Sequence, residues 1–216
     1  MMRKGKQKEK KERRIAQAAL RLFSTKGYRA ASVDRIAEEA GVGKGTIYEY
    51  YDSKSDIFLA ATKEWMMEFQ EKFQSRLSEI EDPVEQLQAV ARMNVELIEP
   101  LDPVNARMTV EVIRQGILED GVIFGRRNEM RDVMQGMQKI VEKILLTGIS
   151  RKLFKAEIAR DVSSIAANFL AYLDGIMLHG ILSENHFQIK EKVGGFMEIL
   201  MHEILTDPDK QNGKLQ

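Results

Sequence analysis

Apolar residues recur every three or four positions along most of this 216-residue chain, and only four prolines interrupt the pattern. That period is typical of amphipathic α-helices. Strands would instead show strict alternation, rich in Val, Ile and Thr, between turn signals. No such segment recurs in the sequence. We therefore expect an all-α fold of about nine helices.

Three short helices are expected in the first quarter of the chain. The first runs from the N-terminus to about Lys26, where Gly27 is placed to end it. The second starts after Ser32, whose hydroxyl can accept a hydrogen bond from the first turn, and Gly41 ends it. The third covers roughly residues 44–50. Two short helices around a glycine-containing turn, packed on a preceding helix, form a helix-turn-helix unit.

Longer helices are expected after this unit. Ser53 with Asp56 resembles a capping box. The Asp-Pro pairs at 82–83 and 102–103 each place an N-cap acid before a proline at the first helical position. The expected ranges are about 53–81, 83–98, 103–118, 127–146, 161–182 and 188–205.

Charge is distributed unevenly, although 33 basic residues balance 33 acidic ones. Residues 1–54 contain 14 Lys or Arg and 7 Asp or Glu, so the first quarter is positive and the remainder is negative. Such an asymmetry suggests that one end of the chain meets a polyanion.

Composition argues against several classes of protein. No apolar stretch approaches the roughly 18 residues of a membrane span, and the charged N-terminus lacks the apolar run of a signal peptide. The absence of cysteine removes disulfides and thiolate zinc sites. The three histidines lack the spacing of a helical metal site. We expect a cytoplasmic protein with no membrane partner, metal or cofactor.

The candidate DNA contacts are basic, hydroxyl-bearing or glycine residues of the helix-turn-helix unit. Basic side chains can meet phosphates, glycine lets the backbone approach, and hydroxyls can bond phosphates or base edges. The candidates are Ser32, Lys44, Gly45, Thr46, Tyr48, Tyr50 and Lys54. Ile47 and Tyr51 are instead expected on the buried stripe with Ile36. For the basic residues between Arg3 and Arg14, a solvated tail and a phosphate-touching arm remain open alternatives.

The segment from Arg14 to Phe58 closely resembles the N-terminal domain of tetracycline-repressor (TetR) family regulators. The likeness runs without gaps through IAQAALRLFSTKGY at 15–28, SVDRIA at 32–37 and AGVGKGTIYEYYDSK at 40–54. Members of that family are mostly homodimeric repressors that leave an operator when a small molecule fills the C-terminal domain. The resemblance implies DNA contacts at the seven candidates. Tyr51 departs from the usual Phe, and Gly43 stands where Ser is common.

The resemblance also implies a domain organisation in which different parts of the chain have different functions. Residues 1–52 would form the DNA-binding domain with its basic arm, residues 53–206 a helical effector-binding and dimerisation domain, and residues 207–216 a disordered tail. The expected partners are a palindromic operator, a second copy of the chain and a small hydrophobic effector. A ligand-free DNA-binding protein, an activator, and a helical enzyme or carrier remain alternatives. The enzyme is disfavoured because the sequence offers no convincing acid–base pair.

Residues 55–216 carry no specific motif, so candidates there come from side-chain type and position on helical stripes. Adaptable or polar side chains on apolar stripes are the candidates for an effector pocket, although such stripes more often form plain core. They are Trp65, Met66, Phe69, Met93, Asn94, Met108, Asn168, Tyr172 and His179. By resemblance, the last two long helices pair with their copies across a two-fold axis. The dimer candidates are Phe169, Leu173, Ile176, Met177, Phe196, Met197 and Leu200. Alternatively, these faces pack only within one chain.

Overall fold

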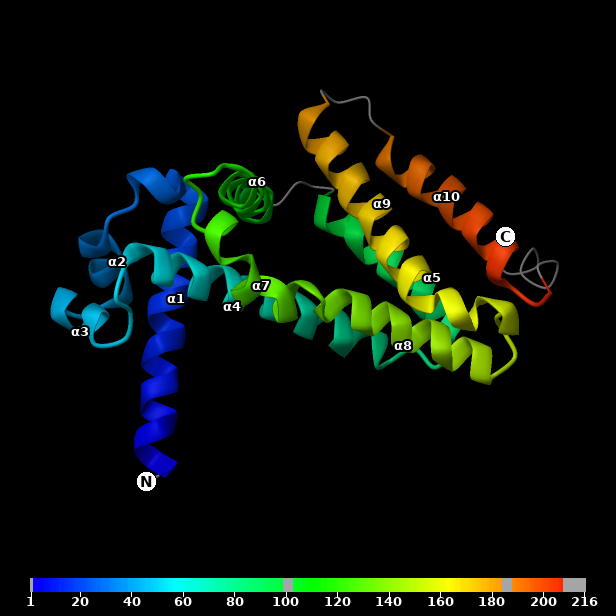
Figure 1. The fold of residues 1–216 in the computed structure, drawn as a ribbon, viewed down its shortest axis with the longest axis horizontal. Coiled ribbons are helices and arrows are strands. Elements are labelled where there is room, and N and C mark those ends of the chain that lie inside the picture. The colour runs from blue at the N-terminus through cyan, green and yellow to red at the C-terminus, as the bar shows by residue number, and fades with distance from the viewer. Residues whose placement is uncertain (1, 99–102, 184–187, 208–216) are drawn as a thin grey trace. The chain divides into compact units, whose positions relative to one another are not determined.

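The computed structural model describes residues 2–98, 103–183 and 188–207, and within them the chain is helical without strands. Its helices are α1 (Met2–Ala30), α2 (Val33–Ala40), α3 (Lys44–Tyr48), α4 (Lys54–Leu77), α5 (Pro83–Ile98), α6 (Pro103–Ile117), α7 (Arg127–Met134), α8 (Gly136–Ser150), α9 (Val162–Leu182) and α10 (Ile189–Ile204) (Figure 1). Two 3-10 turns, η1 (Phe124–Arg126) and η2 (Ala156–Asp161), precede α7 and α9. The all-α prediction is confirmed. The expected disorder of residues 208–216 and the Asp102 cap lie outside the described residues.

Several helix ends fall where the local sequence predicts them. Gly27 leaves the helical region (φ 75°, ψ 165°) and ends the regular part of α1. The Ser32 hydroxyl accepts a hydrogen bond from the Arg35 N–H at 3.3 Å, and Gly41 ends α2 in the left-handed region (φ 61°). The Asp82 carboxylate accepts a hydrogen bond from the Val84 N–H at 3.0 Å and caps α5. Short-range capping therefore determines these boundaries.

The single helix expected over residues 127–146 is wrong. The helix breaks at Gln135 (φ −77°, ψ −8°), and α8 then continues to Ser150. Gly136 follows the break, and a Cβ there would lie 2.2 Å from the Gln70 side-chain oxygen of α4. The apolar stripe continues across the break, so periodicity alone cannot reveal it.

The chain forms two compact units. The first contains residues 1–69 and 101–134. Its core is a cluster of buried side chains from α1, α2, α3, α4, α6 and α7, including Ile15, Ile36, Ile47 and Phe58. Helix α1 packs against α2 and α6. The rings of Phe23 and Phe58 meet edge to face, with centroids 5.1 Å apart, and join α1 to α4.

The second unit contains residues 70–100 and 135–216. Helix α8 packs against α5 and α9, and α10 packs against α5 and α9. Gly148 of α8 lies against the buried ring of Phe154, and Phe154 pairs with Leu205 in an isolated antiparallel bridge. Among the described residues, no helix combines the length and apolar character needed to cross a membrane.

Candidate DNA-binding surface

The outward face of α3 is fixed by one buried side chain. Ile47 is fully buried in the core of the first unit, next to Ile36 of α2. Because α3 is only five residues long, anchoring Ile47 turns Lys44, Gly45 and Tyr48 toward solvent. Tyr48 is 49% exposed, which is unusual for an aromatic side chain on a packed helix. Tyr48 is therefore not a core residue of this unit.

The remaining candidates lie around α3. Ser32 is exposed at the start of α2, whereas Thr46 and Tyr50 are partly buried. The Tyr51 ring is also partly buried, and its hydroxyl donates to the Glu12 carbonyl at 3.2 Å. Burial, with the nearby Glu12 and Glu64, raises the pKa of Tyr51 to about 12. The expected inward position of Tyr51 is thus confirmed, with its hydroxyl satisfied.

Lys44 links the two helices of the unit. Its ammonium donates to the Asp34 carboxylate of α2 at 2.9 Å. This hydrogen bond, with the charge of Asp34, raises the pKa of Lys44 above its ordinary value. Both side chains are more than half exposed, so water and salt screen the pair. A DNA phosphate can therefore take the place of Asp34 without disturbing the packing beneath.

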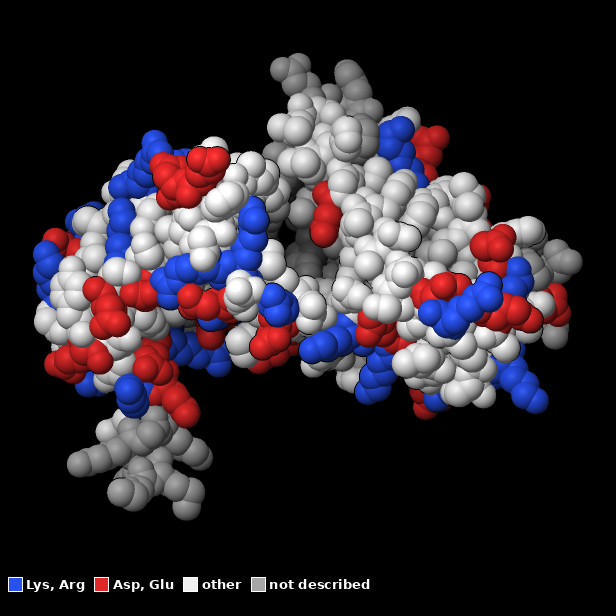
Figure 2. Space-filling model, viewed as in Figure 1, with Lys and Arg blue, Asp and Glu red and all other residues white. Residues whose placement is uncertain are grey.

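Acidic and basic side chains are mixed on the face that Figure 2 shows. Figure 2 shows Lys and Arg interspersed with Asp and Glu on the face in view, and further ion pairs join Arg21 to Glu39 and Arg35 to Glu38. The positive charge of the first quarter is therefore partly neutralised within the unit. The surface around α2 and α3 is not uniformly positive. The candidate DNA contacts therefore differ from the rest of the surface mainly in their position and residue type.

Lys54 has a structural role that the sequence did not indicate. Its ammonium donates to the carbonyls of Tyr28 at 3.0 Å, Ala31 at 3.1 Å and Arg29 at 3.4 Å, and lies 4.5 Å from the centre of the Tyr28 ring. These carbonyls belong to the end of α1 and the residue after it. Lys54 thus fastens the end of α1 to the start of α4, and its DNA contact stays a prediction.

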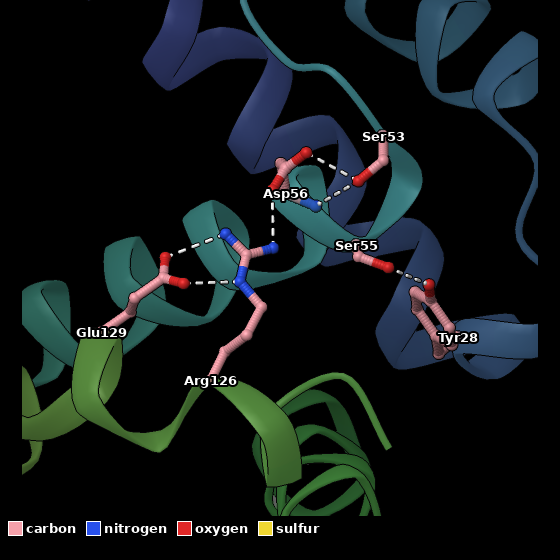
Figure 3. A network of polar contacts seen from close by, with 6 residues as sticks. All are labelled: Tyr28, Ser53, Ser55, Asp56, Arg126 and Glu129. Carbon is pink, nitrogen blue, oxygen red and sulfur yellow. Dashed lines mark hydrogen bonds and ion pairs between the residues drawn. The ribbon is translucent and has the colours of Figure 1, made fainter. Parts of the chain in front are cut away.

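A polar network holds the start of α4 (Figure 3). The Ser53 hydroxyl donates to the Asp56 carboxylate at 2.6 Å and accepts from the Asp56 N–H at 3.2 Å. Arg126 of η1 donates to Asp56 at 2.6 Å and to both oxygens of Glu129 at 2.6 and 2.9 Å. Hydrogen bonds from Ser53 and then Arg126 lower the pKa of Asp56. Sequence reasoning found the Ser53–Asp56 pair but missed Arg126, which lies 70 positions away.

The effector candidates are divided between the two units. Trp65, Met66, Phe69 and Met108 belong to the first, and Met93, Asn94, Asn168, Tyr172 and His179 to the second. Met108 and Met93 are buried, and Asn168 and His179 are exposed. The Trp65 indole donates to Asn105 at 2.9 Å, and the Asn94 amide donates to the Val90 carbonyl at 2.9 Å. Neither unit alone contains all nine, so their joint role stays a prediction.

A cavity of about 260 Å³ lies between α1 and α4 of the first unit. Acidic side chains dominate its polar lining, and none of the effector candidates borders it. Its lining residues are Glu9, Glu12, Arg13, Ala16, Tyr51, Ala60 and Glu64. This cavity is unsuited to an apolar effector.

The dimer candidates lie mostly inside the second unit. Phe169, Leu173, Ile176 and Met197 are buried within one chain, whereas Met177, Phe196 and Leu200 are partly buried. The Phe196 ring stacks on Tyr172 with centroids 3.8 Å apart, and the Tyr172 hydroxyl donates to the Lys192 carbonyl at 3.0 Å. These contacts join α9 to α10. The most exposed apolar side chains on the two helices are instead Leu182 (74%) and Ile199 (71%).

Comparison with known proteins identifies the family. Residues 15–61 match the family model of bacterial regulatory proteins of the tetR family, and residues 62–203 match that of the C-terminal region of YsiA-like proteins. The fatty acid metabolism regulator protein of Bacillus subtilis is 27% identical over 91% of this chain and 96% of its own length. The transcriptional regulator AcrR of Shigella flexneri is 26% identical over 98% of each chain.

A solved structure extends this likeness to three dimensions. The transcriptional regulator FadR from Bacillus subtilis, determined in complex with stearoyl-CoA, has a TM-score of 0.68 and is 25% identical. The match covers 87% of this chain and 96% of that one. Together with the exposed face of α3, these matches show that the chain belongs to the tetR family and is a DNA-binding transcriptional regulator.

Proposed function

We propose that this regulator is a homodimeric repressor that binds a palindromic operator through α2 and α3 and is released by a long-chain acyl effector such as an acyl-CoA. The DNA-binding part of this proposal is supported by the position of α3. A single buried residue, Ile47, holds the helix so that Lys44, Gly45 and Tyr48 face outward. This is the arrangement required of a helix that enters the major groove.

The proposed contacts differ in the part of the DNA that each residue would meet. Lys44 would exchange Asp34 for a phosphate, and the Ser32 hydroxyl would contribute a second phosphate contact beside it. Gly45 leaves open space where a side chain would stand, so the backbone of α3 can approach DNA. Tyr48 has the exposed ring and hydroxyl needed for base or sugar contacts, with Thr46 and Tyr50 at the margin.

The proposed effector class follows from two relatives. One is named a fatty acid metabolism regulator, and a solved relative holds stearoyl-CoA. The C-terminal family match spans residues 62–203, which includes most of the second unit. A hydrophobic effector also agrees with the twelve methionines of the chain, because methionine adapts its shape to apolar ligands.

Dimerisation gives the regulator two recognition helices, as a palindromic operator requires. We assign the interface to the exposed sides of α9 and α10. Small residues Ala171 and Gly194 are exposed on these two helices, which also carry the exposed apolar side chains Leu182 and Ile199. Small residues let two helices approach closely, and the exposed apolar groups would be removed from water.

Release would arise from unequal binding of the effector to two dimer shapes. In the DNA-bound shape the two α3 helices would lie about 34–36 Å apart, one turn of DNA. An effector that favours another spacing by about 1–3 kcal/mol would weaken operator binding some five- to 150-fold. Residues 1–52 would thus carry recognition, and residues 53–206 the effector and the second copy of the chain.

Recognition is tested by selecting duplexes from a random-sequence pool with the full-length protein. Tyr48→Ala should weaken binding to the selected duplex by about 1–3 kcal/mol per site, while the melting temperature stays unchanged. Met67→Ala is the matched control because Met67 has the same 49% exposure on α4. Equal affinities for the two variants would contradict the assignment of Tyr48.

Effector binding is tested separately on the selected duplex. Stearoyl-CoA should raise the melting temperature of the protein and release the DNA, whereas CoA without an acyl chain should do neither. Release by unrelated drugs or dyes but not by acyl-CoA would refute the proposed effector class. Tight binding that no compound changes, spread over many genomic sites, would favour the ligand-free alternative.

A further inference from the structure

The first helix begins well before the part of it that contributes to the core. Among the side chains that the structure describes, the first fully buried one is Ile15, yet the helix begins at Met2. Thirteen residues at 1.5 Å per residue correspond to about 20 Å of helix before the core is reached. Residues 2–14, here named the N-terminal arm, contain eight Lys or Arg and two Glu. The arm is therefore strongly basic.

Some charged residues of the arm lie against α4, and others are exposed. Glu9 and Glu12 border the cavity against α4, and Arg13 on the same side pairs with Glu64 and Glu68. Three lysines of the arm whose side chains the structure describes are exposed, and within the described residues they form no ion pair. They are Lys8, Lys10 and Lys11. Glu9 and Glu12 thus lie beside α4, whereas Lys8, Lys10 and Lys11 are exposed and form no ion pair within the described residues.

The arm passes beside the end of the recognition helix. The Lys8 ammonium lies 6.0 Å from the centre of the Tyr50 ring, two residues beyond the end of α3. Arg14 donates to the carbonyl of Gly41, the residue that ends α2, at 3.3 Å. The arm therefore lies beside the turn between α2 and α3 and beside the residues that follow α3.

This distribution of charge is unfavourable in the isolated protein. Lys8, Lys11 and Arg14 are spaced three apart, which places like charges on one side of the helix. The first turn of α1 contains no acid, so nothing there opposes the positive end of the helix dipole. A polyanion that binds this side of the arm would relieve both effects.

We propose that the N-terminal arm is a second DNA-contacting element, which lies along the phosphate backbone beside the groove that α3 enters. The inference rests on the proposed DNA-binding function and extends it to residues outside the helix-turn-helix unit. Lys8 and Lys11 would each contact a phosphate, independently of base sequence. The contact would increase affinity and its salt dependence while leaving sequence preference to α3.

The test compares two double variants of the full-length protein on duplexes selected from a random pool by the wild type. Lys8→Gln with Lys11→Gln removes two arm charges. Lys139→Gln with Lys143→Gln removes two exposed charges from α8, one turn apart, and serves as the matched control. Affinity is measured from about 50 to 200 mM salt, a range in which phosphate contacts dominate its variation.

The arm variant should bind about 10- to 100-fold more weakly at low salt, with a salt slope shallower by about 0.9 for each lost phosphate contact. Its selected sequence and its melting temperature should match those of the wild type. The control should retain wild-type affinity and slope. Equal slopes for the two variants would overturn the proposal while leaving recognition by α3 intact.

Two other outcomes distinguish failure of the arm proposal from failure of the proposed DNA-binding function. If the wild-type protein selects no duplex at all, the proposed DNA-binding function fails and the arm proposal fails with it. If the arm variant loses binding only to vesicles rich in anionic lipid, while its DNA affinity is unchanged, the arm serves a membrane surface and the proposal is wrong.

Discussion

The two compact units differ in how directly the sequence encodes their surfaces. In the first unit, the Ser32 cap, the left-handed Gly41 and the buried Ile47 set the helix-turn-helix within sixteen residues. In the second unit, Phe169 of α9 packs against chain segments that are distant in sequence. Local signals therefore specify which side of α3 faces outward. Apolar stripes on α9 and α10 look alike whether they form core, pocket or dimer interface.

The sharpest test of this contrast compares one buried phenylalanine from each unit. Phe58→Ala and Phe169→Ala should each lower the free energy of unfolding by about 3–5 kcal/mol, because both side chains are 1% exposed or less. Urea denaturation measures the loss, and light scattering measures association in parallel. If Phe169→Ala mainly weakens dimerisation while the fold keeps its stability, α9 uses that face between chains, and its assignment to the core of one chain is wrong.

A glycine pair tests how tightly the second unit is packed. A Cβ at Gly148 would lie 2.1 Å from the Phe154 ring, so Gly148→Ala should lower the free energy of unfolding by about 1–3 kcal/mol. Gly175 of α9 has open space around it, and Gly175→Ala should raise stability by roughly 0.5–1 kcal/mol because alanine favours the helix. Thermal unfolding measures both. Similar melting temperatures for the two variants would contradict the close Gly148–Phe154 contact.

The Asp56 network tests a tertiary contact of the first unit through pH. Its pKa is lowered from the ordinary value of 3.8, so its contribution is complete well above that value and is lost as the pH falls through the lower folded pKa. Asp56→Asn should lower the free energy of unfolding by about 1–2 kcal/mol at neutral pH, with the difference from wild type shrinking in acid. Denaturant titrations between about pH 2 and 7 measure it. A difference independent of pH would exclude the ionised carboxylate as the cause.

The smallest expected effect concerns Tyr51. Tyr51→Phe removes the hydrogen bond to the Glu12 carbonyl and should change the free energy of unfolding by only about 0.5–1 kcal/mol. Because the pKa of Tyr51 is raised to about 12, its ionisation can be assigned directly in a titration. In an ultraviolet titration, the tyrosine that ionises last in the wild type should be missing from the variant. Persistence of that transition would place it on another tyrosine.

Much of the fold and part of the candidate site follow from local patterns. The helical period predicts the all-α class, and caps such as Ser32 and Asp82 predict helix starts. The contact of Arg126 with Asp56 escapes prediction because the two residues are 70 positions apart. The break at Gln135 escapes it because the apolar stripe continues through the break.

What the sequence determined by itself is the set of short helices around α3 and the side chains available there. Those features depend on hydrogen bonds and sterics over three or four residues, which residue types specify directly. Only the tertiary structure decided that Lys54 fastens α1 to α4, and that Phe169 and Leu173 are buried within one chain. Burial and long-range pairing depend on which distant segments meet in space. The sequence of one apolar helical stripe does not identify the segment that packs against it.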